Sequence, residues 1–399
     1  MNAGSTSSPP ANRALGSARA AKQDEFYTQL PDIANEVRHY KEHLRGKTIL
    51  CNCDDPFESN FFKYFALNFS TFGIKKLIAT SYEGSPIAGA ELPFEEYAGH
   101  KPNGKQARLV EINEVPDLND DGAIDLLDVE QLLRRDANTS RRLYGNGAYG
   151  GGDFRSRECI EILKQADIVV TNPPFSLFRE YVAQFVDYEK RFLIIGNKNA
   201  ITYKEFFKLI QEDRIWIGVT PMGVDLLFDV PEANAKALIA SGKEGSSYKI
   251  VNGVVKGRSS AIWFTNLDNT KRHEFIPLYR MYSPAEYPNI DNYDAINVDK
   301  VVDIPRDYGG RMGVPITFLD RYNPDQFEIL AITKTWLEAA TKTYPKQVQV
   351  SKDGRKSEVT KLNDGPALRL ERPPIGETYY TIGDAIYTQL YQRLIIKRK

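Results

Sequence analysis

The chain has 399 residues, with 52 Lys or Arg and 53 Asp or Glu, so its formal net charge at pH 7 is −1. This length allows a large buried core and suggests two or three domains, while the balanced charge excludes a protein that binds polyanions over its whole surface. Charge is nevertheless uneven, because residues 331–399 hold 13 basic and 7 acidic residues, a net charge of +6. A nucleic-acid site must therefore be local, and the C-terminal part is the better candidate for contact with phosphates.

Cysteine content and hydropathy point to the cytoplasm. The chain has three cysteines, and the Cys51-Asn52-Cys53 spacing suits neither an ordinary disulfide nor a zinc site. No apolar run approaches the roughly 18 residues that a membrane span needs, and the N-terminus lacks the apolar core of a signal peptide. We therefore expect a cytoplasmic protein with no membrane partner.

The first elements follow a polar leader. Residues 1–22 are rich in Ser, Ala, Gly, Asn and Pro and offer little to bury, which predicts disorder. Apolar residues at helical spacing then predict a helix that ends near Gly46. Strands are predicted over residues 47–53 and 76–83, with a phenylalanine-rich helix over 61–69 between them.

Residues 84–150 are expected to be an insertion, and they carry an acidic loop of twelve residues. The loop has the spacing of an EF-hand calcium loop, with Gly122 at the sharp turn and a shorter Asp where the last ligand is usually Glu. The candidate ligands are Asp117, Asn119, Asp121 and Asp128. Two interpretations stay open, a structural calcium site or a solvated acidic turn that caps the following helix.

Strands and helices continue to alternate up to residue 220, which predicts a doubly wound α/β domain. The expected elements are helix 157–165, strand 168–171, helix 177–186, strand 191–196, helix 203–213 and strand 214–219. After residue 220 the pattern changes to short strands and hairpins, with turns at Asn252-Gly253 and 352–355. Four aromatic residues of this part, Trp263, Phe264, Phe275 and Phe318, are expected to be core residues.

The stretch from Asp167 to Phe175 is the most informative. An apolar strand ends at Asn172-Pro173-Pro174-Phe175, because proline cannot donate to a sheet ladder, and open α/β sheets bind their ligands at the carboxyl ends of strands. Asn172 and the Pro173 carbonyl offer hydrogen-bond acceptors, and Phe175 offers a flat apolar face. This set suits a planar base with an exocyclic amino group, which the acceptors would draw towards tetrahedral geometry. The alternative is a chance tetrapeptide in a strand-to-helix turn.

The Asn-Pro-Pro-Phe motif resembles the catalytic motif of amino-group methyltransferases that use S-adenosylmethionine. Two further segments, Asp55–Asn60 and Gly313–Asp320, resemble a narrower group, the EcoRI-type adenine-specific (N6) DNA methyltransferases. This resemblance implies a Rossmann-like, S-adenosylmethionine-dependent core followed by a β-rich C-terminal region. The chain departs from most methyltransferases after its first strand, where Asp-Pro-Phe replaces the usual glycine-rich turn.

The resemblance also implies roles for residues outside the tetrapeptide. Phe26, Tyr27 and Thr28 would lie across the methionine end of the cofactor, and Asp54, Pro56 and Phe57 would meet its amino-acid end. The Asp153 carboxylate would accept a hydrogen bond from the cofactor's adenine, on which the Phe154 ring would pack. Structural alternatives stay open for two of these segments: an aromatic anchor for the first helix at 26–28, and a plain turn capped by Ser59 or Asn60.

The expected organisation is a disordered leader (1–22), a cofactor-binding and catalytic domain (23–220, with the insertion 84–150), and a DNA-binding target-recognition region (221–399). The implied function is methyl transfer to the N6 amino group of adenine in double-stranded DNA, as in restriction-modification systems, with base flipping and direct in-line transfer. A monomer is compatible with the sequence. The alternatives are a cytosine-N4, RNA or protein-glutamine methyltransferase, or a non-catalytic DNA- or calcium-binding protein with a decayed cofactor site.

Overall fold

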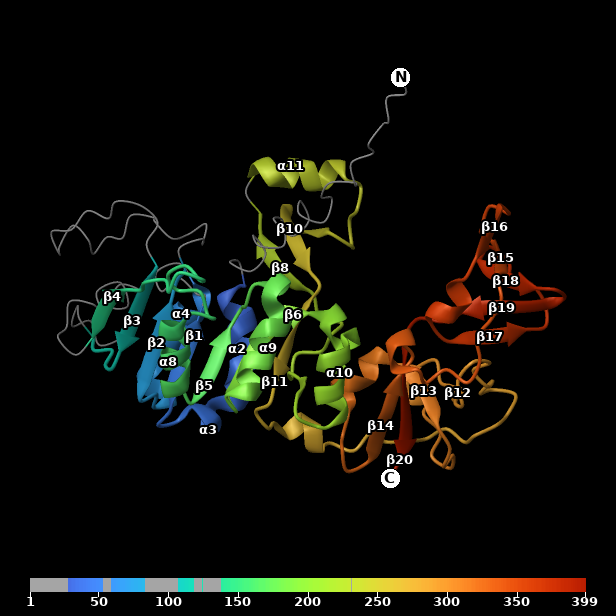
Figure 1. The fold of residues 1–399 in the computed structure, drawn as a ribbon, viewed down its shortest axis with the longest axis horizontal. Helices are drawn as coiled ribbons and strands as arrows, with labels where there is room; N and C mark the ends of the chain where they lie inside the picture. Colours follow the sequence, from blue (N-terminus) through green and yellow to red (C-terminus); the bar gives the residue numbers. More distant parts are fainter. Residues whose placement is uncertain (1–27, 53–58, 83–106, 118–123, 125–137, 231) are drawn as a thin grey trace, which may run out of the picture. The chain divides into compact units, whose positions relative to one another are not determined.

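The computed structural model describes residues 28–52, 59–82, 107–117, 124, 138–230 and 232–399, and the structural statements below concern these residues. The chain divides into two compact units (Figure 1). The first consists of Met1–Lys198 and Val224–Leu267, and the second of Asn199–Gly223 and Asp268–Lys399. None of the described helices is long and apolar enough to cross a membrane.

A mixed sheet forms the centre of the first unit, with its strands in the order β4-β3-β2-β1-β5-β6-β11. The pairs β2/β1, β1/β5 and β5/β6 are parallel, whereas β3, β4 and β11 pair antiparallel with their neighbours. β1 and β5 are buried along their whole length, as expected for parallel strands covered on both faces. The strands are β1 (Thr48–Asn52), β2 (Lys76–Thr80), β3 (Arg108–Ile112), β4 (Thr139–Arg142), β5 (Ile168–Thr171), β6 (Arg191–Asn197) and β11 (Ala261–Thr265).

The helices of this unit up to residue 187 confirm those predicted from apolar spacing, whereas the helix at 232–240 lies where only short strands and hairpins were expected. Ser59 caps α4 by accepting a hydrogen bond from the Phe61 amide at 3.1 Å, as the cap interpretation of this turn predicts. α9 buries one apolar face and contacts β6. The helices are α2 (Leu30–Val37), η2 (Arg38–Tyr40), α3 (Lys41–Leu44), α4 (Asn60–Leu67), α5 (Phe69–Phe72), α8 (Arg157–Gln165), η4 (Phe175–Leu177), α9 (Phe178–Asp187) and α11 (Glu232–Ala240).

A small antiparallel sheet also belongs to the first unit, with the order β8-β10-β9. Its strands are β8 (Leu226–Asp229), β9 (Tyr248–Val251) and β10 (Val254–Ser259). Asn252 and Gly253 have φ values of 52° and 78°, so both central residues of the β9–β10 turn are left-handed. This confirms the predicted Asn-Gly hairpin, because such turns require a positive φ at both positions.

The second unit is rich in β structure. Its two sheets have the orders β12-β13-β20-β14 and β16-β15-β18-β19-β17, and the predicted hairpin at 352–355 joins β15 to β16. The strands are β7 (Trp216–Ile217), β12 (Ile296–Asn297), β13 (Met312–Pro315), β14 (Phe327–Ile332), β15 (Gln347–Val350), β16 (Lys356–Val359), β17 (Ala367–Leu370), β18 (Tyr379–Ile382), β19 (Ala385–Gln389) and β20 (Arg393–Arg398). The longest helix of this unit is α10 (Lys204–Gln211), and short 3-10 turns are η6 (Thr270–His273), η7 (Val301–Asp303), η8 (Ile316–Arg321), η9 (Thr335–Leu337) and η10 (Lys361–Asp364).

Three of the four aromatic residues expected in the core are fully buried, namely Trp263, Phe264 and Phe318. Trp263 packs against Phe61 with ring centroids 5.8 Å apart. The prediction for Phe275 is wrong, because its side chain is 66% exposed. Phe275 lies just after η6 in a segment without helix or strand, so no periodic face carries it into a core.

The chain passes from the first unit to the second at residue 199, back to the first at 224 and again to the second at 268. The sequence suggested a single domain boundary near residue 220. Residues 224–267 return to the first unit, because the buried strand β11 pairs along its whole length with β6. Residues 199–223, which include α10 and β7, belong to the second unit.

Candidate active site

The tetrapeptide lies where β5 ends. Asn172, Pro173 and Pro174 are buried, Phe175 is half-buried, and η4 and α9 follow directly. The strand is tied to β1 at both ends, because the Asp167 carboxylate accepts from the Thr48 amide at 2.8 Å and the Thr171 hydroxyl donates to the Asn52 carbonyl. The position of Asn172 is therefore set by the buried core of the sheet.

The Asn172 side chain reaches the segment before α2. Its Nδ2 donates to the Thr28 hydroxyl at 3.5 Å, and the Thr28 carbonyl accepts from Asn60 Nδ2 at 2.7 Å. Asn60 is the first residue of α4. These contacts bring Thr28, predicted to bind the cofactor, beside Asn172, predicted to act on the target amine.

A hollow opens beside these residues, with about 280 Å³ of empty space that includes open solvent. Asn172 and Phe175 line it, and most of the remaining lining is apolar. The other lining residues are Thr28, Asp32, Ile195, Leu226, Leu227, Phe228, Ser259 and Ala261.

Several of these lining residues were not singled out from the sequence. Asp32 lies in the first turn of α2, where an acidic residue usually signals only a favourable helix start. Phe228 and Ser259 lie on β8 and β10, beyond the residue at which the catalytic domain was expected to end. The pairing of β11 with β6 connects this part of the chain to the central sheet, and no local sequence motif predicts that pairing.

The loop that precedes α8 packs against the same edge of the sheet. Gly152 has φ +73°, and a Cβ at this position would lie 1.9 Å from the Ser81 carbonyl oxygen, just after β2. Because β2, β1 and β5 are parallel, Ser81 and Asn172 both follow carboxyl ends at one edge. The predicted cofactor residue Asp153, next to Gly152, is thereby held at the edge that carries the tetrapeptide.

Asp153 has a protein partner in this structure. Arg155 donates from Nε to Oδ1 at 3.0 Å and from Nη2 to Oδ2 at 2.8 Å, and its Nη1 contacts Glu180 at 2.9 Å. Burial acts to raise the pKa of Asp153, but the hydrogen bonds and charge of Arg155 outweigh it and hold the pKa below the usual range. The carboxyl group is therefore kept ionised, and both of its oxygens act as hydrogen-bond acceptors.

Phe154 is 3% exposed and packs on Tyr181, with ring centroids 4.0 Å apart. Tyr181 belongs to the buried face of α9. This contact fixes the Phe154 ring between the loop and α9, so the structure shows it as a packing residue beside the candidate cofactor edge.

One buried polar atom at this edge supports a ligand site. Asn52 ends β1, is 5% exposed, and its side-chain oxygen has no hydrogen-bond partner among the described residues. A buried acceptor left unpaired costs about 1–3 kcal/mol. A polar cofactor group at the carboxyl end of β1 would satisfy it, so the edge fits a ligand such as S-adenosylmethionine.

Several predicted site residues lie outside the described part of the chain. They are Phe26, Tyr27, Asp54, Pro56 and Phe57 of the cofactor set, and Asn119, Asp121 and Asp128 of the acidic loop. Asp117 alone of the loop's candidate ligands is described, and the described residues contain no cluster of three or more His, Cys, Asp or Glu side chains that could hold a metal.

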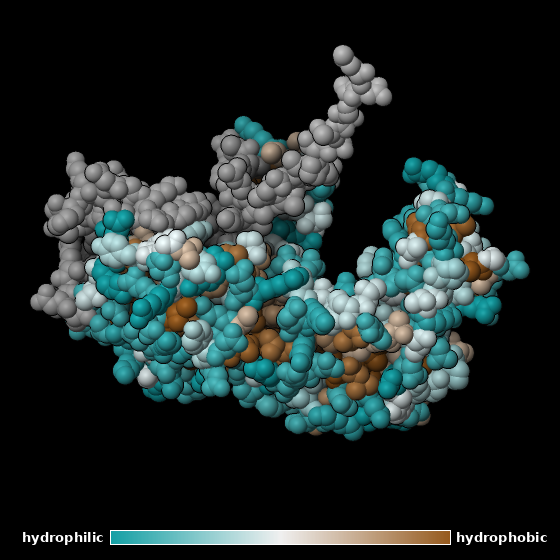
Figure 2. Space-filling view, in the orientation of Figure 1, coloured by the Kyte–Doolittle hydropathy of each residue, from teal (hydrophilic) through white to brown (hydrophobic). Residues whose placement is uncertain are grey.

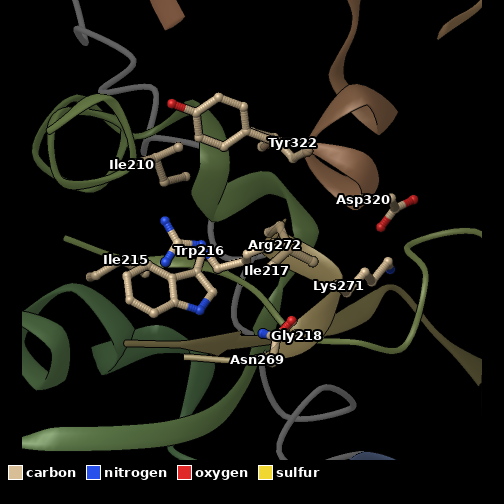
Figure 3. Close-up of a pocket in the computed structure, with 11 residues that line it drawn as sticks. Ile210, Ile215, Trp216, Ile217, Gly218, Asn269, Lys271, Arg272, Asp320 and Tyr322 are labelled. Atoms are coloured by element: carbon tan, nitrogen blue, oxygen red, sulfur yellow. The ribbon is translucent and has the colours of Figure 1, made fainter. Parts of the chain in front are cut away.

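A second hollow lies within the second unit (Figure 3). Its most prominent feature is the Arg272 guanidinium, 3.6 Å from the centre of the Trp216 ring and paired with Asp213 at 2.5 Å. Lys271 donates to the Val219 carbonyl at 2.8 Å. Both cations already bind groups of the protein, so we interpret this hollow as part of the packing of the second unit. The hollow of Asn172 and Phe175 is the better candidate for catalysis.

Comparison with known proteins assigns the chain to a family. The family model described as adenine-specific methyltransferase EcoRI matches residues 14–399. The Type II methyltransferase M.EcoRI of Escherichia coli is 45% identical over 330 residues, which cover 81% of this chain and 90% of that protein. The Type II methyltransferase M.MpnI of Mycoplasma pneumoniae is 37% identical over 320 residues, 78% of this chain and 83% of the relative. No solved structure gives a significant match.

The protein is thus of the class of site-specific, adenine-specific DNA methyltransferases. Within that class, the chain belongs to the EcoRI family of adenine-specific methyltransferases. This confirms the family and the enzyme class predicted from the tetrapeptide and the Asp-Pro-Phe turn, and it connects the chain with restriction-modification. Membership of a methyltransferase family implies use of S-adenosylmethionine.

Proposed function

We propose that the protein transfers a methyl group from S-adenosylmethionine to the N6 amino group of adenine in double-stranded DNA. Asn172 and the Pro173 carbonyl accept hydrogen bonds from the target amine, and Phe175 stacks on the base. The observation that carries this proposal is that Asn172 and Phe175, at the buried end of β5, both line one mostly apolar hollow.

The geometry of Asn172 suits an acceptor role. Because its Nδ2 donates towards Thr28, the amide is turned with its oxygen on the opposite side. The residue is 5% exposed, so a hydrogen bond to it forms in a poorly solvated place, where electrostatic interactions are stronger than in water. Two acceptors that bind both amine hydrogens draw the nitrogen out of conjugation with the ring, and its lone pair becomes available for attack.

The cofactor, when bound, supplies an electrophilic methyl group on a sulfonium. We assign its binding to the carboxyl edge of β2, β1 and β5, in a Rossmann-like, doubly wound arrangement, with Asn52, Asp153 and Thr28 as polar contacts from the described chain. Phe26, Tyr27, Asp54, Pro56, Phe57 and Phe154 complete the proposed cofactor set. Transfer is direct and in line, so the protein contributes mainly the positioning of the amine.

The target base must leave the double helix, because its amine lies inside the base stack. We place target recognition in residues 221–399. The C-terminal 69 residues have the net charge of +6 noted above, and Lys352, Arg355 and Lys356 are exposed on and beside the β15–β16 turn. Figure 2 shows this hairpin as a hydrophilic surface. Exposed cations of this kind suit contact with phosphates.

Replacement of Asn172 by Ala tests the proposal. Methyl transfer to DNA should be lost, whereas the affinity for S-adenosylmethionine, measured by calorimetry, should stay within about two-fold, since the amide acts on the target amine. Asn138→Ala is the matched control: it removes another 5% exposed amide of the same unit, whose oxygen accepts from the Asn113 amide at 2.8 Å. The control should lose stability but keep its rate of transfer. Equal loss of transfer and cofactor affinity in the Asn172 variant would contradict the assigned role.

A further inference from the structure

Asp32 is the one titratable side chain among the described residues that line the hollow of Asn172 and Phe175. We propose that its carboxylate takes up the proton that the target amine must lose when it is methylated. This inference rests on the proposed function, because it assigns a base to the same reaction.

The surroundings of Asp32 leave its carboxylate available. The residue is half-buried, and its side chain makes no hydrogen bond or ion pair with any described residue. Its backbone amide donates to the Gln29 carbonyl at 3.0 Å, which fixes the residue at the start of α2. An ionised group in such a place is costly unless something compensates it, and in a cleft such a group is a candidate for function.

Among the residues that the structure describes, the charged groups named below from the neighbouring elements are engaged elsewhere or do not line the hollow. On α2, Glu36 is buried and accepts from the Tyr40 hydroxyl at 2.8 Å. On the side of β8 and β10, Arg258 pairs with Asp225. Lys63, on the packed helix α4, is not among the lining residues. Burial alone accounts for the raised pKa of Asp32, which makes it a stronger proton acceptor than a surface aspartate.

The reaction needs such an acceptor. The amine lone pair forms the new nitrogen–carbon bond, and the electron pair of the carbon–sulfur bond stays on sulfur. The methylated nitrogen is then cationic and must release one of its hydrogens as a proton. An amide oxygen or a backbone carbonyl accepts hydrogen bonds but is too weak a base to hold this proton at neutral pH. In the proposal, the Asp32 carboxylate receives it and later passes it to water.

The test compares Asp32→Asn with Asp32→Glu in the full chain, under single-turnover conditions, across the acidic and neutral pH range. The wild-type rate should fall as the pH drops through the pKa of Asp32, because the protonated acid cannot accept a proton. The Asp32→Asn variant should lose about 10²-fold in rate, the lower end of the usual effect of general base catalysis, and should lack this acidic limb. The Asp32→Glu variant should recover part of the rate together with the limb.

Binding measurements and a matched control keep the inference falsifiable. Calorimetry should show unchanged affinity of Asp32→Asn for S-adenosylmethionine, and Asp187→Asn, at an exposed position at the end of α9, should behave like the wild type. A wild-type rate and pH profile in the Asp32→Asn variant would overturn the inference. So would a loss confined to cofactor affinity, which would make Asp32 a ligand of the cofactor. If Asn172→Ala abolishes transfer while Asp32→Asn changes nothing, the proposed function stands and only this inference fails.

Discussion

Gly152 offers a sharp test of the way in which the loop before α8 is held against the sheet. Substitution by Ala places a Cβ 1.9 Å from the Ser81 carbonyl oxygen and 2.8 Å from Tyr82 Cα, and both neighbours are backbone atoms that cannot rotate away. The residue also has φ +73°, which side chains other than glycine rarely adopt. The loop must therefore move, and it carries Asp153 with it.

The magnitude follows from two contributions. A left-handed backbone conformation costs an alanine roughly 1–2 kcal/mol, and overpacking against a rigid neighbour typically adds about 1–3 kcal/mol. Gly147 provides the matched control, because its φ is +82° and a Cβ there would meet nothing within 4 Å. Gly147→Ala should thus cost roughly 1–2 kcal/mol in the free energy of unfolding, and Gly152→Ala about 2–5 kcal/mol.

Urea unfolding of the two variants and the wild type measures this difference, and calorimetric titration with S-adenosylmethionine measures its consequence at the site. The Gly152 variant should bind the cofactor more weakly, whereas the Gly147 variant should bind it normally. Equal destabilisation by the two substitutions would refute the close approach to Ser81. Destabilisation without any loss of cofactor affinity would separate this loop from the cofactor site.

Three further predictions concern charge. Because the pKa of Asp153 is lower in the folded state than its ordinary value of 3.8, ionisation of Asp153 stabilises the fold at any pH above 3.8. This stabilisation disappears as the pH falls from 3.8 through the lower folded pKa. Asp153→Asn should remove that part of the acid sensitivity seen in unfolding curves. Affinity for DNA should fall steeply as the salt concentration rises. Replacement of Lys352, Arg355 and Lys356 by Ala should reduce the slope of log K against log salt by about one for each phosphate that the protein no longer neutralises. A triple variant that keeps the wild-type slope would contradict this prediction. If the acidic loop holds calcium, millimolar calcium should raise the melting temperature after chelator treatment, magnesium should do so less, and Asp121→Ala should abolish the effect; an unmoved melting curve would favour the helix-cap interpretation.

Local chemistry explains which parts of the structure were predictable from the sequence. β5 follows from four buried apolar or β-branched residues that end at two prolines, and the β9–β10 turn follows from the tolerance of Asn252 and Gly253 for positive φ. The pairing of β11 with β6 was not predictable, because the sequence of an apolar strand does not specify which distant strand it pairs with. For the same reason, the sequence did not identify Phe228 as a residue of the candidate site. Asp32 was not identified either, because an acidic residue in a first helical turn is ordinary.

The late return of the chain to its first unit has a consequence for synthesis. Residues 28–198 contain the parallel strands and the tetrapeptide, but Leu226, Phe228, Ser259 and Ala261 reach the hollow only with β8, β10 and β11. On the ribosome, where the N-terminal part of a chain emerges first, a nascent chain would possess Asn172 well before these later lining residues of its hollow. Chains released before β11 is translated would therefore lack a complete hollow for the target base. Activity towards DNA would appear only once translation has passed β11.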